Sequence, residues 1–524
     1  MTTKQKDAIV IGAGISGLVT AKTLKEDNFD VTIIERSSDI GGLWTYREKD
    51  YGVMSFTHIN VSKYNYAFSD FPFPETVPDY PHHSDMAKYI KDYASHFKLN
   101  ELVHFNLRVV GIEQTEGDKW KVICNKVKED RQTDDSTEGI VVYTCNYLAI
   151  TTGHHAKPSW PKFKGEESFS GKIIHSVDYK DAVYNGFAGK RVLVVGIGNS
   201  AVDVAVDCAT VGRCPSVYIS SRSGAWVIPN YVLGVPTDLY ACRFFLHLPK
   251  RVTNFVFGFL VSLVQGSPWK WGLNPKMRAL ETQPTVSPTL IHHIQRGNVK
   301  ISPDIKEIDG STVYFIDGSC ADFDRIIYCT GYKIDLPFLP KSIKEQVTIG
   351  ESNEMQLYRN VFLPEIGASL AFIGFVQPAS GGLLTMSEIQ ARWFSELCKG
   401  KIQLPPASNM KADILDKQKD SQQRWYRSAR HTIQQDPIIY TDEIASFIGA
   451  KPYVVSNPSL AWRLLFSSCG VSQWRLNGPH KWSRAAEQVK KVPVPPLWNY
   501  TGYVLVLIIL GLLYKIIIYL LNLF

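Results

Sequence analysis

Short runs of apolar residues alternate with longer amphipathic stretches along most of this 524-residue chain. The runs at 9–11, 31–34, 191–195 and 217–220 have the length and the branched side chains of strands that are buried on both faces. Between residues 86 and 97, the apolar side chains recur at helical spacing, which predicts an amphipathic helix. Buried strands that alternate with helices predict an α/β fold built on parallel sheets.

The first apolar run leads into a glycine-rich turn with the spacing of a dinucleotide fingerprint. Gly12 permits the tight turn, Gly14 leaves room for a pyrophosphate, and Gly17 lets the following helix pack close to the strand. The next predicted strand ends in Glu35, whose carboxylate can accept both ribose hydroxyls and would repel a 2′-phosphate. This site therefore suits FAD or NAD and disfavours NADP.

A second fingerprint follows the strand at 191–195 and differs at its decisive position. Gly196 and Gly198 keep the turn, and Ala201 stands where the third glycine is usual, which the motif allows. The strand at 217–220 is followed by Arg222 and by no acid. Because a guanidinium can pair with a 2′-phosphate through two charge-assisted bonds, this site suits NADPH.

The two fingerprints predict two Rossmann-like domains, with the NADPH domain inserted in the FAD domain. Strands predicted at Val141–Thr152 and Ile326–Tyr332 end in Thr-Gly, and the chain would cross between the domains there before it returns through Ala371–Gly374. The expected order is a first FAD part at 1–155 and an NADPH domain at 156–330, which carries an insertion around 235–290. A second FAD part follows at 331–490, and a C-terminal membrane anchor at 498–524.

Composition and charge agree with a folded multidomain protein. The net charge of +7 is mild and spread along the chain, so it makes no case for nucleic acid. The nine cysteines contain no CxxC pair, which leaves no metal spacing or redox disulfide to propose.

The C-terminus reads as a membrane segment. Residues 503–524 are long enough to cross a bilayer, and Lys515 is their only charge. This predicts a C-terminal transmembrane helix. A second apolar stretch, Phe255–Val264, is too short to span, so it is either an element that lies on the membrane or an ordinary buried helix.

At 169–179 the chain reads FSGKIIHSVDY, and here it resembles the flavin-containing monooxygenases, whose signature is FxGxxxH followed by three residues and an aromatic. Related Baeyer–Villiger enzymes usually carry tryptophan where this chain has Tyr179. Further matches are the stretches GGLW with Gly42, Leu43 and Trp44, DFPFP at 70–74, GIGNS with Asn199 and Ser200, and IQARW with Gln390. The resemblance covers essentially the whole chain.

The resemblance implies a reaction and two cofactors. NADPH reduces FAD, dioxygen forms a C4a-hydroperoxyflavin, and a small lipophilic amine or sulfide takes up the distal oxygen. It also implies an endoplasmic reticulum membrane location with the catalytic domain facing the cytosol, and it leaves a homo-oligomer open.

The resemblance also implies roles for particular residues. Asn60 aligns with an active-site asparagine that donates to the peroxide, although by itself it reads as a residue capping a turn. Asn199 would lie near the nicotinamide, and Gln390 would contact the flavin ring or its ribityl chain. His175 is expected to be structural rather than catalytic.

Rival functions differ in what they require. A flavin disulfide reductase needs a cysteine pair that is absent, and a tethered protein without turnover fits poorly with intact fingerprints. A Baeyer–Villiger oxygenase and an NADPH oxidase that releases hydrogen peroxide stay open. The chain departs from the family at Val61, at Tyr64-Asn65 and between about 233 and 290, which border the expected substrate channel.

Overall fold

A computed structural model describes residues 7–49, 51–115, 117, 119–127, 139–155, 157–348, 353–426 and 432–496, with isolated positions beyond them. Its core is a pair of five-stranded parallel sheets. The first sheet contains, in spatial order, β22 (Leu370–Phe372), β7 (Tyr147–Ile150), β1 (Asp7–Ile11), β2 (Asp30–Ile34) and β3 (Val103–His104).

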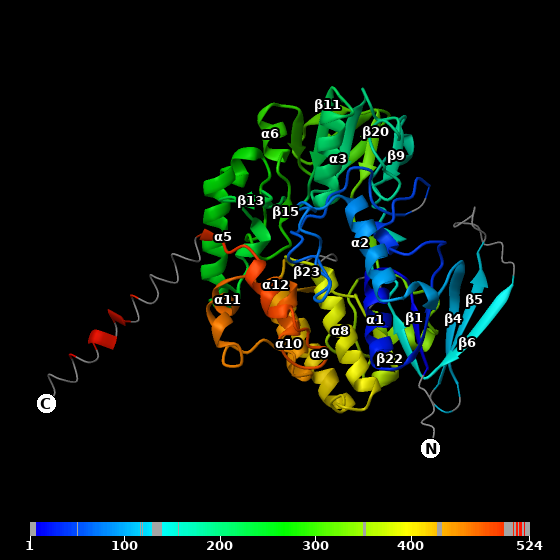
Figure 1. The fold of residues 1–524 in the computed structure, drawn as a ribbon. Coiled ribbons are helices and arrows are strands. Elements are labelled where there is room, and N and C mark those ends of the chain that lie inside the picture. The colour runs from blue at the N-terminus through cyan, green and yellow to red at the C-terminus, as the bar shows by residue number, and fades with distance from the viewer. Residues whose placement is uncertain are drawn as a thin grey trace, which may run out of the picture.

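The second sheet is built entirely from chain that lies between β7 and β22 of the first. In spatial order its parallel strands are β16 (Val299–Ser302), β11 (Ser216–Ser220), β10 (Arg191–Val195), β20 (Arg325–Tyr328) and β9 (Lys172–His175). The two glycine fingerprints follow β1 and β10, the middle strands of the two sheets. The α/β class and the insertion of one sheet unit inside the other agree with the sequence prediction, and Figure 1 shows the two units one above the other.

Alternate side chains of β1 enter different cores. Val10 packs into a cluster on the helical face, whereas Ile9 and Ile11 pack into a cluster on the opposite face. This is why the strand reads as one continuous apolar run. The helical face carries α1 (Ile15–Glu26), α2 (His83–His96), α8 (Leu383–Cys398) and α10 (Pro437–Phe447). The helix predicted at 86–97 is thus confirmed as α2.

The opposite face of the first sheet is covered by an antiparallel meander. The single strand predicted at Val141–Thr152 is wrong, because it forms two strands in two different sheets. They break at Asn146, where the backbone N–H donates to the Asp7 carbonyl at 3.1 Å. The meander consists of β4 (Leu107–Thr115), β5 (Lys119–Lys126) and β6 (Ile140–Cys145), and β7 continues in the parallel sheet.

The second sheet is also covered on both faces. Val192 and Val194 of β10 pack toward the helices, and Leu193 and Val195 pack toward a second meander. The helices are α3 (Asn199–Thr210) and α6 (Leu290–Gln295), and the meander is β17 (Ile305–Asp309), β18 (Thr312–Phe315) and β19 (Cys320–Asp322).

The chain crosses between the two units twice, and the two crossings pair with each other. β8 (Lys157–Pro158) lies antiparallel to β21 (Tyr332–Lys333). Beside this pair, the Thr330 hydroxyl donates to the Ser159 carbonyl at 2.5 Å. The Thr-Gly strand ends singled out in the sequence therefore lead into one antiparallel pair of short strands.

The segment expected to insert around 235–290 forms the outer edge of the second unit. It begins with β14 (Val235–Pro236), which forms a hairpin with β13 (Tyr231–Val232), and continues through α4 (Arg243–His247) and α5 (Lys250–Gln265) to β15 (Thr285–Val286), which pairs with β12 (Val227–Ile228). The remaining elements of the chain are α7 (Lys341–Val347), β23 (Gln377–Pro378), α9 (Ala407–Arg424), β24 (Gln434–Gln435), α11 (Ala461–Phe466) and α12 (Ala485–Lys491).

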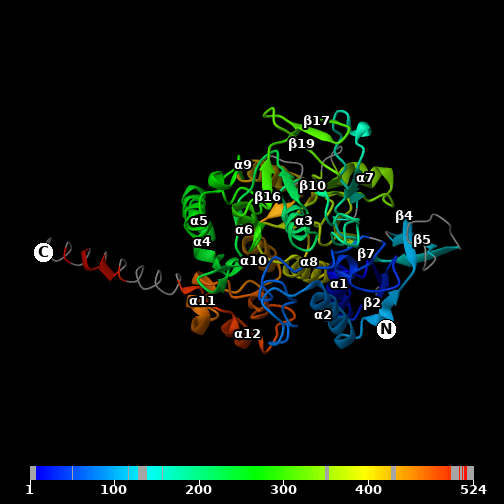
Figure 2. The same cartoon turned by 90° about the horizontal axis from the view of Figure 1, so that it is seen from above.

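Helix α5 lies at the periphery of the molecule in both views (Figures 1 and 2). Phe255, Phe259 and Leu263 are 73%, 58% and 70% exposed, and their spacing places them on one face of the helix. The interpretation of this stretch as an ordinary buried helix is therefore wrong.

The predicted span at 503–524 lies mostly outside the described residues. Within the described residues, no helix is both long and apolar enough to cross a membrane.

Candidate functional site

The first glycine turn has the geometry that its sequence predicts. Gly12 adopts a φ of +108°, and a side chain at Gly17 would place its Cβ 1.8 Å from the Gly12 carbonyl oxygen. At Gly14, an added Cβ would meet nothing closer than the Gly42 Cα at 3.7 Å. The protein therefore leaves open the space above Gly14, at the N-terminus of α1, where a pyrophosphate fits.

Glu35 is tied to this turn from the end of β2. Its buried carboxylate accepts the Ala13 N–H at 2.7 Å, and the Ser37 N–H and hydroxyl at 2.9 and 2.7 Å. These bonds hold the carboxylate beside the glycine turn and leave a lone pair of Oε2 for a ribose hydroxyl.

The GGLW stretch packs against the same turn. The Gly41 N–H donates to the Ala13 carbonyl at 3.0 Å, and Gly42, Leu43 and Trp44 form one 3₁₀ turn. Gly42 has a φ of +58°, and the Trp44 ring meets Tyr66 edge to face at 5.6 Å. All three residues are partly exposed, as a cofactor-facing position requires.

The second glycine turn repeats this construction at the end of β10. Gly196 has a φ of +119°, and an added Cβ would lie 2.4 Å from the Cys329 carbonyl oxygen. Gly198 caps the N-terminus of α3, which Asn199 and Ser200 begin. The Asn199 side-chain oxygen Oδ1 accepts the Val286 N–H at 2.9 Å, so the side chain fastens the turn to β15.

Arg222 lies just after the end of β11, the strand that pairs with β10. It is exposed, and no hydrogen bond or ion pair joins its guanidinium to any residue that the structure describes. An exposed guanidinium without a described partner is available to an anionic group of a bound dinucleotide.

Asn60 is half-buried, and its amide makes no hydrogen bond to any described residue. The backbone around it is held firmly. The Ile59 N–H donates to the Pro81 carbonyl at 3.0 Å, and the Lys63 N–H donates to the backbone carbonyl of Asp79 at 2.7 Å. The interpretation of Asn60 as a turn cap thus finds no bond to support it, because a cap would accept a backbone N–H.

Gln390 lies in the interior of the protein. Its side chain is fully buried within α8, where it accepts the Gly374 N–H at 2.8 Å and donates to the Tyr440 hydroxyl at 2.7 Å. These partners occupy its amide inside the protein, and contact of Gln390 with the flavin stays a prediction. Gln390 acts through the backbone at Gly374, which follows β22 and whose added Cβ would strike Ser16 of α1.

His175 is buried at the end of β9, where its ring accepts the Val177 N–H at 3.2 Å. Burial lowers the pKa of its imidazole to about 4, so the ring is neutral at physiological pH. This environment fits the structural role expected of it.

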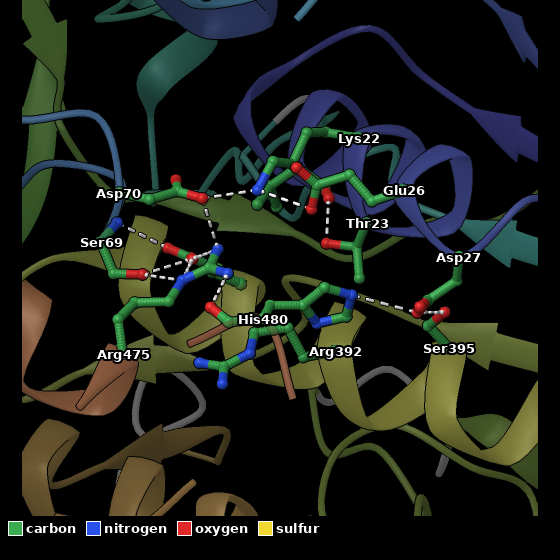
Figure 3. Close-up of polar contacts among 12 residues, drawn as sticks. Lys22, Thr23, Glu26, Asp27, Ser69, Asp70, Arg392, Ser395, Arg475 and His480 are labelled. Atoms are coloured by element: carbon green, nitrogen blue, oxygen red, sulfur yellow. Dashed lines mark hydrogen bonds and ion pairs between the residues drawn. The ribbon is translucent and has the colours of Figure 1, made fainter. Parts of the chain in front are cut away.

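A buried charge network behind α1 was not foreseen from the sequence (Figure 3). The Arg475 guanidinium contacts Glu388 of α8 and lies 3.0 Å from Asp70, and Asp70 lies 2.5 Å from Lys22 of α1. Burial alone would raise the pKa of Asp70, but Arg475 and Lys22 outweigh it and hold the pKa below its usual value. Arg392 beside this network donates to the Trp474 and Pro479 carbonyls.

The departures at Tyr64-Asn65 have partners in the structure. Burial and the nearby Asp79 raise the pKa of the Tyr64 hydroxyl, and the Asn65 amide donates to Asp238 at 2.8 Å and accepts the Ser468 hydroxyl at 3.0 Å. A narrow pocket of about 50 Å³ adjoins Asn65. Its lining includes Asp238, Leu246, Gly382, Thr385, Thr441, Gln473 and Trp474.

Comparisons with known proteins agree over almost the full length. A family described as flavin-binding monooxygenase-like matches residues 5–491. Flavin-containing monooxygenase 5 of Rattus norvegicus is 35% identical over 515 residues, which cover 93% of this chain and 91% of that protein. Dimethylaniline monooxygenase [N-oxide-forming] 2 of the same species is 34% identical over 507 residues, with 92% and 91% covered.

Solved structures share the fold at lower identity. S-allyl-L-cysteine S-oxygenase from Allium sativum has a TM-score of 0.62 at 22% identity and covers 85% of this chain and 89% of its own. The OTEMO complex with FAD and NADP has a TM-score of 0.62 at 18% identity and covers 87% and 99%.

Proposed function

Since the chain belongs to the flavin-binding monooxygenase-like family, we propose that it transfers one oxygen atom from dioxygen to small lipophilic amines and sulfides. It is a FAD- and NADPH-dependent monooxygenase. The observation that carries the proposal is the pair of glycine turns on two sheets of one chain, one beside Glu35 and the other beside an unpaired Arg222.

The proposed cofactor residues divide between the two turns. When bound, FAD supplies a ring that accepts hydride from NADPH and activates dioxygen. The first turn, Glu35 and the GGLW stretch would hold FAD, and Arg222 would pair with the 2′-phosphate of NADPH. In full, these residues are Gly12, Gly14, Gly17, Glu35, Gly42, Leu43 and Trp44 for FAD, and Gly196, Gly198, Asn199, Ser200 and Arg222 for NADPH.

Asn60 would supply the polar contact at the reacting oxygen. Its amide is unpaired on a firmly held backbone, and an amide donates a hydrogen bond without providing an acid. Gln390 takes no part in this step, since its polar atoms are used inside α8.

Isotope labelling tests the proposal. Turnover of the FAD-loaded enzyme with NADPH and ¹⁸O₂ should place one labelled atom in the sulfoxide or N-oxide for each NADPH consumed. Labelled hydrogen peroxide with no labelled product would indicate an oxidase. A labelled ester from a ketone, with amines and sulfides inert, would indicate Baeyer–Villiger oxygenation.

The proposal includes attachment to the endoplasmic reticulum membrane with the catalytic part facing the cytosol. It rests on the apolar sequence at 503–524 and on the exposed face of α5, which presents Phe255, Phe259 and Leu263. An exposed amphipathic helix of this kind binds at a lipid interface. Lys250 and Arg251 at the start of α5 would complement anionic headgroups.

A further inference from the structure

The polypeptide turn at 60–65, which carries Asn60, is joined to the inserted segment through one carboxylate, Asp238. The Ser62 N–H donates to Asp238 Oδ1 at 3.1 Å, and the Ser62 hydroxyl donates to Oδ2 at 2.7 Å. The Asn65 amide donates to the same Oδ2 at 2.8 Å. Three donors from one short turn therefore converge on a single side chain more than 170 residues away.

The remaining contacts of the turn close it into a rigid unit. The Asn65 N–H donates back to the Ser62 carbonyl at 2.9 Å, and the Val471 N–H donates to the Tyr64 carbonyl at 3.1 Å. At Gly382, an added Cβ would lie 2.3 Å from the Asn65 carbonyl oxygen. Asn60 stands at the start of this unit, and its side chain makes no hydrogen bond to a described residue.

Asp238 makes these contacts as a carboxylate without a countercharge. No ion pair joins it to a lysine, arginine or histidine among the described residues. Burial raises the pKa of Asp238, and the bonds from Ser62 and Asn65 offset part of that rise. A half-buried carboxylate that accepts three dipolar donors fixes their positions strongly, since leaving the donors of the buried Ser62 unpaired is costly.

We propose that Asp238 is a positioning residue that holds Asn60 in place for oxygen transfer. The proposal rests on the function proposed above, and it makes the inserted segment part of the active site. Asp238 acts here as an acceptor of hydrogen bonds and neither gives nor takes a proton. Loss of the carboxylate loosens the turn, so that activated oxygen decays to hydrogen peroxide before it reaches the substrate.

Two substitutions separate positioning from charge. Asp238→Ala leaves the Ser62 N–H, the Ser62 hydroxyl and the Asn65 amide without an acceptor. Asp238→Asn keeps an oxygen for the Ser62 N–H, and the Ser62 hydroxyl and the Asn65 amide can reorient to pair with the new NH₂. We expect Asp238→Ala to raise the fraction of NADPH that ends as hydrogen peroxide about fivefold, and Asp238→Asn to stay within about twofold of the native enzyme.

Tyr80→Phe is the matched control. The Tyr80 hydroxyl donates to the Asn230 carbonyl and ties the same hairpin region to the FAD unit without touching the 60–65 turn. Its peroxide fraction should match that of the native enzyme. An equal rise in Tyr80→Phe would show that any loosening of the hairpin suffices, and it would overturn the assignment to Asp238.

Amide hydrogen exchange of the FAD-loaded enzyme, without substrate or NADPH, tests the turn independently of catalysis. Exchange at the Ser62 amide should rise about tenfold in Asp238→Ala and stay unchanged in Asp238→Asn and Tyr80→Phe. Unchanged exchange in Asp238→Ala overturns the proposal. An equal rise of the peroxide fraction in Asp238→Ala and Asp238→Asn overturns it as well. If the native enzyme itself returns all its NADPH as peroxide, the proposed oxygenase function fails instead, and the exchange result still decides the role of Asp238.

Discussion

Asn60 and Arg222 share one feature, since neither side chain makes a hydrogen bond to a described residue. By contrast, Glu35 and Asp238 each accept three hydrogen bonds, and the Asn199 side chain accepts one. Unpaired groups are available to a ligand, whereas paired groups shape the backbone that presents them. This division at the residue scale supports Asn60 and Arg222 as groups that touch substrate or cofactor.

Replacement of Asn60 by aspartate should spare FAD binding and abolish oxygen transfer. A carboxylate occupies the same space but cannot donate while ionised, so sulfoxidation should fall by roughly 100-fold or more. FAD content per chain and sulfoxide yield measure the two effects. Unchanged sulfoxidation in a fully FAD-loaded variant would refute the role of Asn60.

Replacement of Arg222 by alanine should raise the KM for NADPH by roughly 10- to 100-fold and leave the KM for NADH nearly unchanged. The reason is that only NADPH carries the 2′-phosphate that the guanidinium would pair with. Arg222→Lys keeps the charge but loses the paired donors, so its KM for NADPH should lie between those of the native enzyme and Arg222→Ala. An equal rise for both nucleotides would place the phosphate elsewhere.

At the element scale, the positions of the strands, the glycine turns and α2 followed from the sequence because burial pattern and turn chemistry are local. The break between β6 and β7 did not, since it depends on which sheet each half joins. Gln390 lies in a matched motif, yet helix packing turns it into the core. The network of Asp70, Glu388 and Arg475 brings together residues from three distant segments, which no local pattern reports.

Alanine at Gly14 and alanine at Gly17 of the first turn should have different effects on the protein. Gly17→Ala places a Cβ 1.8 Å from a backbone oxygen and should impair folding of the FAD unit. Gly14→Ala meets only an ordinary contact at 3.7 Å, so the chain should fold but bind FAD weakly, because the methyl group occupies the space of the pyrophosphate. Soluble yield, Tm and FAD content distinguish the outcomes. Equal FAD content in Gly14→Ala and the native enzyme would contradict the account.

The charge network behind α1 should make the protein sensitive to acid. Asp70 has a lowered pKa in the folded state, so its contribution to stability is complete above the unfolded pKa near ~4 and is lost as pH falls toward the folded value. Asp70→Asn should lower the free energy of unfolding by roughly 3–5 kcal/mol at pH 7 and flatten its decline below ~pH 4.

An exposed pair provides the control for this network. Asp92→Asn breaks an ion pair with Lys88 on the surface of α2 and should change stability by less than ~1 kcal/mol. Urea unfolding at saturating FAD, from neutral to acid pH, measures both variants. A parallel pH profile for Asp70→Asn and the native enzyme would show that the network does not cause the acid sensitivity.

At the scale of the whole molecule, the exposed apolar face of α5 lies on the outer edge of the unit that also contributes Asp238. Attachment there would place the inserted segment next to lipid, where lipophilic substrates concentrate. The membrane surface and the proposed positioning of Asn60 would then belong to one continuous segment of the chain.

Two changes should be needed to free the enzyme from membranes. Deletion of residues 498–524 should weaken membrane retention, and the further change of Phe255, Phe259 and Leu263 to serine should release the protein into the soluble fraction with FAD bound. Cell fractionation and vesicle flotation measure this. If the deletion alone releases all of the enzyme, α5 does not bind the membrane, and if the combined variant is retained, another surface does.

The central claim is that this enzyme holds activated oxygen until a soft nucleophile accepts it. The most direct test reduces the FAD-loaded enzyme with NADPH under anaerobic conditions, admits oxygen, and follows the absorbance with and without a sulfide. We predict a long-lived band that differs from both reduced and oxidised flavin and disappears faster with the sulfide, as sulfoxide forms in proportion to NADPH. Immediate return to the oxidised spectrum, with one hydrogen peroxide per NADPH whether or not sulfide is present, would contradict the account.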